Sequence, residues 1–189
     1  MVCDNYAIKN LSEALTVEGA LFLIDTQMTR FRSPLLAEAL AFWTRKAKPD
    51  LLPSRREFTP PNMRTFLSKV ALFEFVKQQD GAFRIRARLT GPEFSRVFSE
   101  MSRKYVDEVV PQNFYRRWVL MFDAAHAYGR PFRVVFVPAA FGREHSVVEL
   151  LLAPLVDEAG EQNQFVVTLN FEFGASWSAV YAEEAKHLI

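Results

Sequence analysis

The chain has 189 residues, half of them hydrophobic and 18 of them phenylalanine, so it suits one domain with a large core and is short for two. Its 23 basic and 22 acidic residues give a net charge of +1. That balance argues against a dedicated nucleic-acid-binding protein, because phosphate contacts need a clustered surplus of lysine and arginine. With Cys3 as its single cysteine, the chain can form neither an internal disulfide nor a cysteine-rich zinc site, and a reducing, cytoplasmic setting is expected.

The N-terminal region contains the apolar run "GALFLI" (19–24). This run is far shorter than the roughly 20 residues that span a bilayer. Acidic residues precede it and a basic segment does not, so we expect neither a membrane span nor a signal peptide, and the protein is expected to be soluble. Residues 1–32 leave two alternatives open, a helix throughout or a helix followed by a strand.

Ser33-Pro34 predicts the start of a helix, with serine as N-cap and proline at the first helical position. Leu36, Leu40 and Trp43 continue with helical spacing and form an apolar stripe. The stripe is predicted either to pack on the outer face of a sheet or to contact a second copy of the chain, as a dimer or flanking-helix contact. Four prolines in 49–61 then predict an irregular connector.

Residues 67–76 and 82–90 read as the two strands of an antiparallel hairpin. A three-residue loop, Gln79-Asp80-Gly81, with glycine in the left-handed conformation would join them. This register places Phe75 beside Ile85 and makes the second strand alternate between apolar and basic side chains.

The basic side chains of that second strand are Arg84, Arg86 and Arg88, and the register places Glu74 near Arg86. Three interpretations are open: a solvated face on an edge strand, a contact with a partner or the N-terminal segment, and an anion site. Charged residues on edge strands prevent unwanted strand addition, so the solvated face is favoured.

The remainder of the chain predicts a helical middle followed by three strands. The helical segments are 92–101, 106–110 and 112–129, the last ending at a glycine. The strand segments are 131–139, 144–156 and 164–173, and the tail 176–188 has the composition of a short helix. This order predicts an α+β fold with a five-stranded antiparallel sheet and short helices on one face.

Four segments are similar to PAS domains, in particular to a bacterial group of short, stand-alone PAS-like proteins. They are "FWTRKAKPDLLPSRREFTPPNMRTFLSKVALFEF", "FRIRARLTGPEF", "YGRPF" and "VVELLLAPLVDEAG". In that group a tryptophan-bearing helix precedes a proline-rich connector, a strand, an Arg-Leu-x-Gly-like turn and a Val-Glu-x-Leu-Leu-x-Pro-Leu segment. The resemblance covers about 35–172.

The resemblance implies a PAS-like domain at 62–174, after an N-terminal helical extension and connector at 1–61 and before a tail at 175–189. It implies a sensory or regulatory module in signal transduction that binds a small ligand, a partner protein or both, without catalysis. A purely structural protein-interaction domain with a filled core is the alternative. A cytoplasmic homodimer is expected, with a regulatory partner protein or a small apolar ligand and with no nucleic acid.

The chain departs from that group after the glycine turn. Where the group shows a Phe-Gly-x-x-Leu-Thr-Gly-like run, this chain has "VFSEMSRKYVDEV", with Ser99 and Ser102 near the expected glycines. Glycine permits positive φ or close backbone packing, so its loss predicts a reshaped helical middle. The ligand of a relative is therefore not carried over to this chain.

Aromatic side chains crowd the helical middle, opposite inward positions of the last strands. They either fill the core or line a pocket for a small, mostly apolar ligand. The candidate pocket residues are Phe94, Phe98, Phe114, Trp118, Phe122, His126, Val148 and Leu150.

The resemblance raises two cofactors for consideration, haem and flavin. A histidine of PAS relatives can ligate haem, and His126 lies in the corresponding element, although a lone histidine without a recognisable supporting partner favours a structural or surface role. Flavin photochemistry needs a reactive cysteine in the central helices; because Cys3 is far from them in sequence and the light-sensing motif is missing, no flavin photochemistry is expected.

Catalytic and metal motifs are missing from the sequence: it has no Gly-x-Ser-x-Gly, no phosphate loop and no metal-binding His or Cys spacing. An enzyme using Glu144 and His145 is the remaining catalytic alternative. Glu149 is predicted instead to pair with a cation on the outer sheet face, because alternate residues of a strand face opposite sides.

Overall fold

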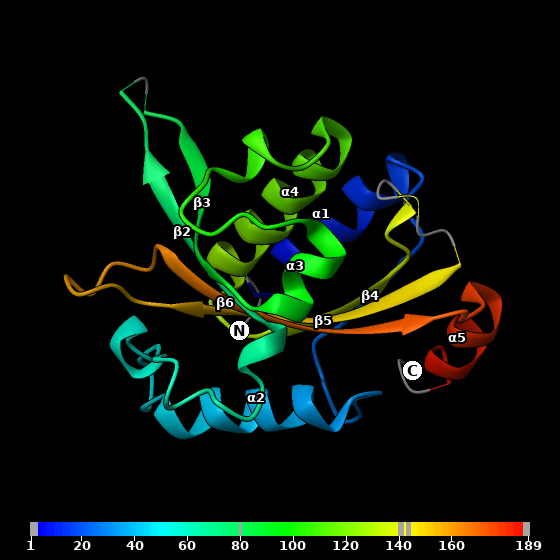
Figure 1. Ribbon diagram of the computed structural model, residues 1–189, viewed down its shortest axis with the longest axis horizontal. Coiled ribbons are helices and arrows are strands. Elements are labelled where there is room, and N and C mark those ends of the chain that lie inside the picture. Colours follow the sequence, from blue (N-terminus) through cyan, green and yellow to red (C-terminus); the bar gives the residue numbers. More distant parts are fainter. Residues whose placement is uncertain (1–3, 80, 140–141, 143–144, 187–189) are drawn as a thin grey trace.

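The computed structural model describes residues 4–79, 81–139, 142 and 145–186 (Figure 1). Its centre is a six-stranded sheet in the order β1-β4-β5-β6-β2-β3, with antiparallel pairing between neighbours. The strands are β1 (Phe22–Asp25), β2 (Val70–Lys77), β3 (Phe83–Thr90), β4 (Phe132–Phe136), β5 (Ser146–Leu155) and β6 (Gln164–Phe173).

The predicted α+β class with an antiparallel sheet is confirmed, but the sheet has six strands where five were expected. The additional strand is β1, which follows helix α1 (Asp4–Val17), so of the two alternatives for this region the helix followed by a strand is the one found in the described residues 4–32. By pairing with β4, β1 satisfies backbone groups that an edge at β4 would leave open. Four residues are too few to show the alternation that identifies a strand in sequence.

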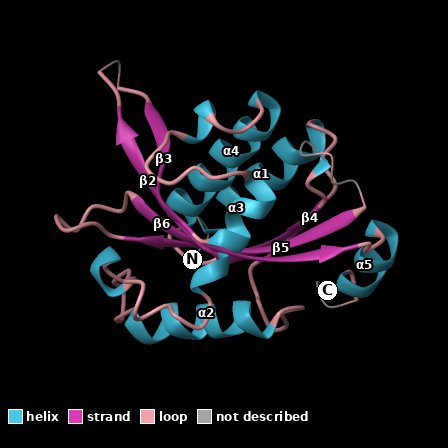
Figure 2. Cartoon of the chain, in the orientation of Figure 1, coloured by secondary structure: helices cyan, strands magenta, loops and turns pink. Residues whose placement is uncertain are grey.

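Helices cover both faces of the sheet (Figure 2). Helices α1, α3 (Pro92–Phe98) and α4 (Gln112–Tyr128) lie on one face, called here the inner face. Helices α2 (Pro34–Lys46) and α5 (Trp177–Glu184) pack on the opposite, outer face. The expectation that helices lie on one face therefore describes the central helices only.

Strand β5 shows why both faces are covered. All of its residues are buried: Val148, Leu150 and Leu152 belong to the inner core, whereas Leu151 and Leu155 belong to the outer core under α2. A strand buried on both faces is nearly continuous in apolar residues, as "VVELLLAPL" is.

The hairpin register predicted from the sequence is confirmed. Glu74 lies opposite Arg86, and Phe75 lies opposite Ile85. Gly81 has φ +87°, the left-handed conformation expected of it, while Asp80 of the same loop lies outside the described residues.

The absence of the two glycines that the PAS-like group shows has a definite structural consequence at Ser99. This residue follows α3 with φ 74° and ψ 162°, a combination that is essentially restricted to glycine. The backbone conformation that glycine would favour is thus kept by a serine. Ser102, by contrast, does not have a positive φ. Its hydroxyl accepts a hydrogen bond from the Thr90 N–H at 3.0 Å.

Replacing Ser99 with glycine is expected to raise the free energy of unfolding by about 1 kcal/mol, because it removes the strain of a side chain at this φ and ψ. Urea denaturation followed by circular dichroism measures the change. Ser102→Gly is the matched control and should lower stability, since it deletes the hydroxyl that holds Thr90. Equal effects of the two substitutions would contradict the assignment of strain to Ser99.

Candidate functional site

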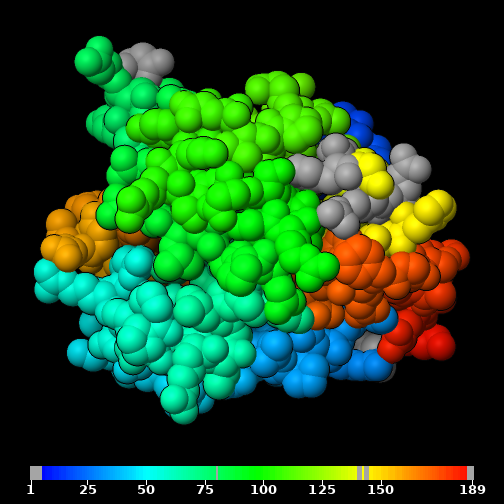
Figure 3. Space-filling model, in the orientation of Figure 1, coloured from blue at the N-terminus to red at the C-terminus, as the bar shows by residue number. Residues whose placement is uncertain are grey.

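The candidate pocket residues of the central helices form one aromatic cluster against the inner sheet face. Trp118 is 1% exposed and contacts its neighbouring rings at centroid distances between 5.2 and 6.1 Å. Those rings belong to Phe73, Phe94, Phe98, Phe114 and Phe122, and Val148 and Leu150 lie in the same core. On the face shown in Figure 3, the helical middle (green) presents a closed surface.

One polar atom inside this cluster lacks a partner. The indole Nε1 of Trp118 is buried and meets no hydrogen-bond acceptor among the described residues. A buried N–H without an acceptor is uncommon, because its desolvation is not compensated. This atom is the one feature of the cluster that could recognise a polar group of a ligand.

His126 lies apart from the cluster. Its side chain is exposed near the end of α4, its carbonyl accepts a hydrogen bond from Gln162, and its ring contacts Phe75 at 5.9 Å. The rings of Phe75 and Phe122 each lie 4.9 Å from Phe165 and occupy the interior next to it. These residues do not fit a haem site, because a haem would have to displace packed phenyl rings.

Other chemical candidates are dispersed. His145 is exposed, while Glu144 and Cys3 lie outside the described residues. Within the part of the chain that is described, no three His, Cys, Asp or Glu side chains gather closely enough to hold a metal ion. The helices of that same part are too short or too polar to cross a membrane.

The apolar stripe of α2 packs on the outer sheet face. Leu36 is fully buried there, and Trp43 is buried and donates its indole N–H to the carbonyl of Pro154 at 2.9 Å. Leu40 is only partly buried and borders a shallow groove on the outside of α2. Of the stripe, Leu40 is therefore the residue still available to a second copy.

The arginine stripe lies on β3, which is an edge strand, and its side chains pair with local carboxylates. Arg84 donates to Asp107 at 2.8 Å and stacks on Tyr105 at 3.8 Å. Arg86 pairs with Glu74, as expected, and the exposed Arg88 lies 3.5 Å from that same carboxylate. The pairs fit the solvated-face interpretation, because each cation already has a nearby carboxylate.

A buried ion network on the outer face connects segments that are distant in sequence. Glu149 and Arg133 are 1% and 2% exposed and form an ion pair at 2.6 Å. Glu149 also accepts the backbone N–H groups of Arg32 and Ser33, at 2.8 and 2.9 Å. The cation expected to face Glu149 is thus Arg133, and Glu149 also anchors the start of α2, where the Ser33 side chain makes no cap hydrogen bond.

The same network holds helix α5 on the sheet. Arg133 donates to Glu184 of α5 at 2.8 Å and contacts Asp25 of β1 at 3.4 Å. Burial alone would raise the pKa of Glu184, but hydrogen bonds and charges from Arg133 and Arg32 lower the pKa below its usual value. The sequence signal for this network was Arg133 inside the apolar run "PFRVVFVPA", since a cation in a buried strand needs a carboxylate.

These features can now be compared with known proteins. A family model described as "PAS domain" matches residues 31–170. The chain belongs to the PAS domain family. PAS domains are generally sensory, non-catalytic modules. The matched region begins before α2 and ends in β6, so α1 and β1 precede the part shared with other PAS domains.

Among solved structures, that of an RNA-binding light-oxygen-voltage receptor is similar to this PAS domain at 14% identity and a TM-score of 0.41. The similarity covers 89% of this chain and 42% of the receptor chain, so the present chain spans less than half of the receptor's length. No curated protein sequence matches this chain.

Proposed function

We propose that this PAS domain is a non-catalytic regulatory module that acts through contacts with other proteins, with an interior filled by its own side chains. The observation that carries the proposal is Trp118, which is 1% exposed and surrounded by phenyl rings in the space between α3, α4 and the sheet. Dense aromatic packing stabilises the fold but leaves little volume for a second molecule.

Regulation by such a module requires a partner that favours one arrangement of a flanking element over another. Helices α2 and α5 are suited to this, because both pack on the outer sheet face, and α5 is attached there by ion pairs of Arg32 and Arg133 as well as by the apolar contacts of Val180. The expected homodimer would use the outside of α2, where Leu40 is partly exposed.

Native mass spectrometry of the freshly purified protein tests the proposal. The expected spectrum contains the polypeptide alone, at the mass of the homodimer, with no retained small molecule. Phe98→Ala is the matched positive control: it should open a cavity beside Trp118 and take up benzene, as dry apolar cavities do, whereas the wild-type protein should not. A stoichiometric small molecule on the wild-type protein would contradict a filled interior.

The unpartnered Nε1 of Trp118 supports a second candidate function, the binding of a small apolar ligand that carries one hydrogen-bond acceptor. Such a ligand would have to displace phenyl rings to reach the indole. It would be detected in the same spectra as a mass that Trp118→Phe abolishes, since phenylalanine keeps an aromatic ring at this position and lacks the N–H donor.

A further inference from the structure

Strand β1 forms one edge of the sheet, and its outward backbone groups meet no hydrogen-bond partner in the part of the chain that the structure describes. The Val137 N–H donates to the Leu21 carbonyl at 3.1 Å, and the register then pairs Phe22 with Phe136 and Leu23 with Val135. In an antiparallel ladder, alternate residues direct their backbone groups to the partner strand. The backbone N–H and C=O groups of Leu21 and Leu23 therefore point towards β4. Those of Phe22 and Ile24 point away from it.

The outward groups of Phe22 and Ile24 meet no hydrogen-bond partner among the described residues. They are two residues apart, which is the spacing that one further antiparallel or parallel strand would match. A sheet edge of this kind is the template used when an extended peptide adds as a strand.

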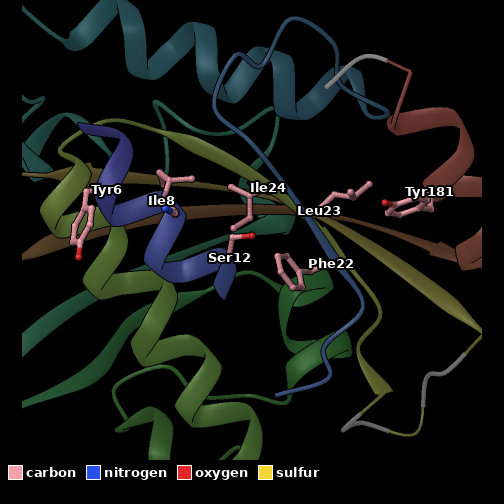
Figure 4. Close-up of a pocket in the computed structure, with 8 residues that line it drawn as sticks. Tyr6, Ile8, Ser12, Phe22, Leu23, Ile24 and Tyr181 are labelled. Carbon is pink, nitrogen blue, oxygen red and sulfur yellow. The ribbon is translucent and has the colours of Figure 1, made fainter. Parts of the chain in front are cut away.

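The unpaired edge lies in a groove of about 650 Å³ between two helices (Figure 4). Tyr6, Ile8 and Ser12 border it from α1, and Tyr181 borders it from α5 on the other side. The side chains of Phe22 and Ile24 turn towards the inner core, whereas that of Leu23 turns towards the core under α5. An added strand would therefore place alternate side chains against α1 and against α5.

We propose that this groove binds an extended peptide segment of a partner protein, which adds to the sheet beside β1. The proposal rests on the proposed function, and it names the class of partner and the surface. The peptide has apolar residues at alternate positions and lacks a cation opposite Lys9, because Lys9 is the one charged side chain among the residues that line the groove.

A second copy of the chain fits this site less well than a peptide. Two paired strands lie about 4.8 Å apart, and two edges that are each flanked by α1 and α5 would bring those helices together first. Only eight of the described residues line the groove, whereas a stable dimer interface uses about 20 to 30 residues on each partner. A single extended segment meets both limits.

The test begins with a library of random twelve-residue peptides displayed on phage and selected on the immobilised full chain. The best peptide is then synthesised and its binding measured by fluorescence anisotropy. Ile24→Pro removes the outward N–H without removing a bond to β4, and Ile24→Ala keeps that N–H while also shortening the side chain. The proline variant is expected to bind about tenfold or more weakly than the alanine variant.

The peptide itself supplies a test that does not depend on the folding of a variant. Methylation of alternate backbone nitrogens of the peptide should abolish binding to the wild-type protein in one register and leave it unchanged in the other, because only one set of N–H groups faces β1.

Failure to enrich any peptide, equal binding by the proline and alanine variants, or equal effects of both methylation registers would overturn the inference. So would a wild-type dimer that Ile24→Pro dissociates, since it would assign the edge to a second copy. If peptide binding is lost in the Leu40→Arg variant and kept in the Ile24→Pro variant, strand addition at β1 is overturned, while the proposed function still stands. A small molecule retained in native mass spectra would contradict the proposed function alone.

Discussion

Replacing Arg133 with methionine is expected to lower the free energy of unfolding by about 3 to 5 kcal/mol, because the change leaves Glu149 as a buried carboxylate without its cation. Glu184 and Asp25 lose the same partner, so α5 and β1 should both loosen from the sheet. Urea denaturation measures the global loss, and hydrogen exchange of the α5 amides reports the local one.

The matched control is the double variant Arg133→Met with Glu149→Leu. It should recover part of the lost stability, because an apolar pair replaces an uncompensated charge. A loss below about 1 kcal/mol for Arg133→Met alone would contradict the view that the pair holds the outer face together.

The network also predicts how stability depends on pH. The folded-state pKa of Glu184 lies below its ordinary value of 4.5, so its contribution to stability is complete above pH 4.5 and is lost as the pH falls through the folded-state pKa. Arg133→Met should flatten this acid limb relative to the wild-type protein.

Replacing Gly91 with alanine is expected to cost about 3 kcal/mol of stability. A Cβ at this position would lie 2.3 Å from the carbonyl oxygen of Leu67 and 2.5 Å from that of Ser68, and both are backbone atoms that cannot move aside alone. The glycine of the Arg-Leu-x-Gly-like turn is thus required for close approach of two backbone segments, and thermal or urea denaturation measures the loss.

Gly129→Ala is the control for Gly91→Ala. Gly129 ends α4 with φ +66°, and a Cβ there meets no atom within 4 Å, so the substitution tests backbone conformation without a clash. Its expected cost is about 1 kcal/mol. Equal costs at the two positions would show that the contact with Leu67 and Ser68 relaxes easily.

Elements with strong local signals were predicted closely. Helix α2 runs from Pro34 to Lys46, where the proline and the basic pair had placed it; β6 has its expected bounds, and β3 starts one residue later than expected. The pairing of Glu74 with Arg86 also followed from the sequence, since a short glycine loop leaves few registers for a hairpin.

The positions of the candidate pocket residues were predicted in part, and their role as a site stays a prediction. The aromatic residues chosen from the helical middle do come together, because helical spacing places Phe114, Trp118 and Phe122 on one face. His126 was grouped with them by its position in α4, yet its side chain is exposed. The open edge of β1 was missed, because pairing with β4 joins residues more than 100 positions apart.

The sequence by itself determined the class of fold, the hairpin register and the aromatic part of the inner core, because these depend on periodicity and on turns within a few residues. Only the tertiary structure decided the sixth strand, the partners of Arg133 and whether the aromatic side chains meet one another or leave a cavity. Those features arise from contacts between distant segments, and the free energy of such contacts depends on the burial that the complete fold creates.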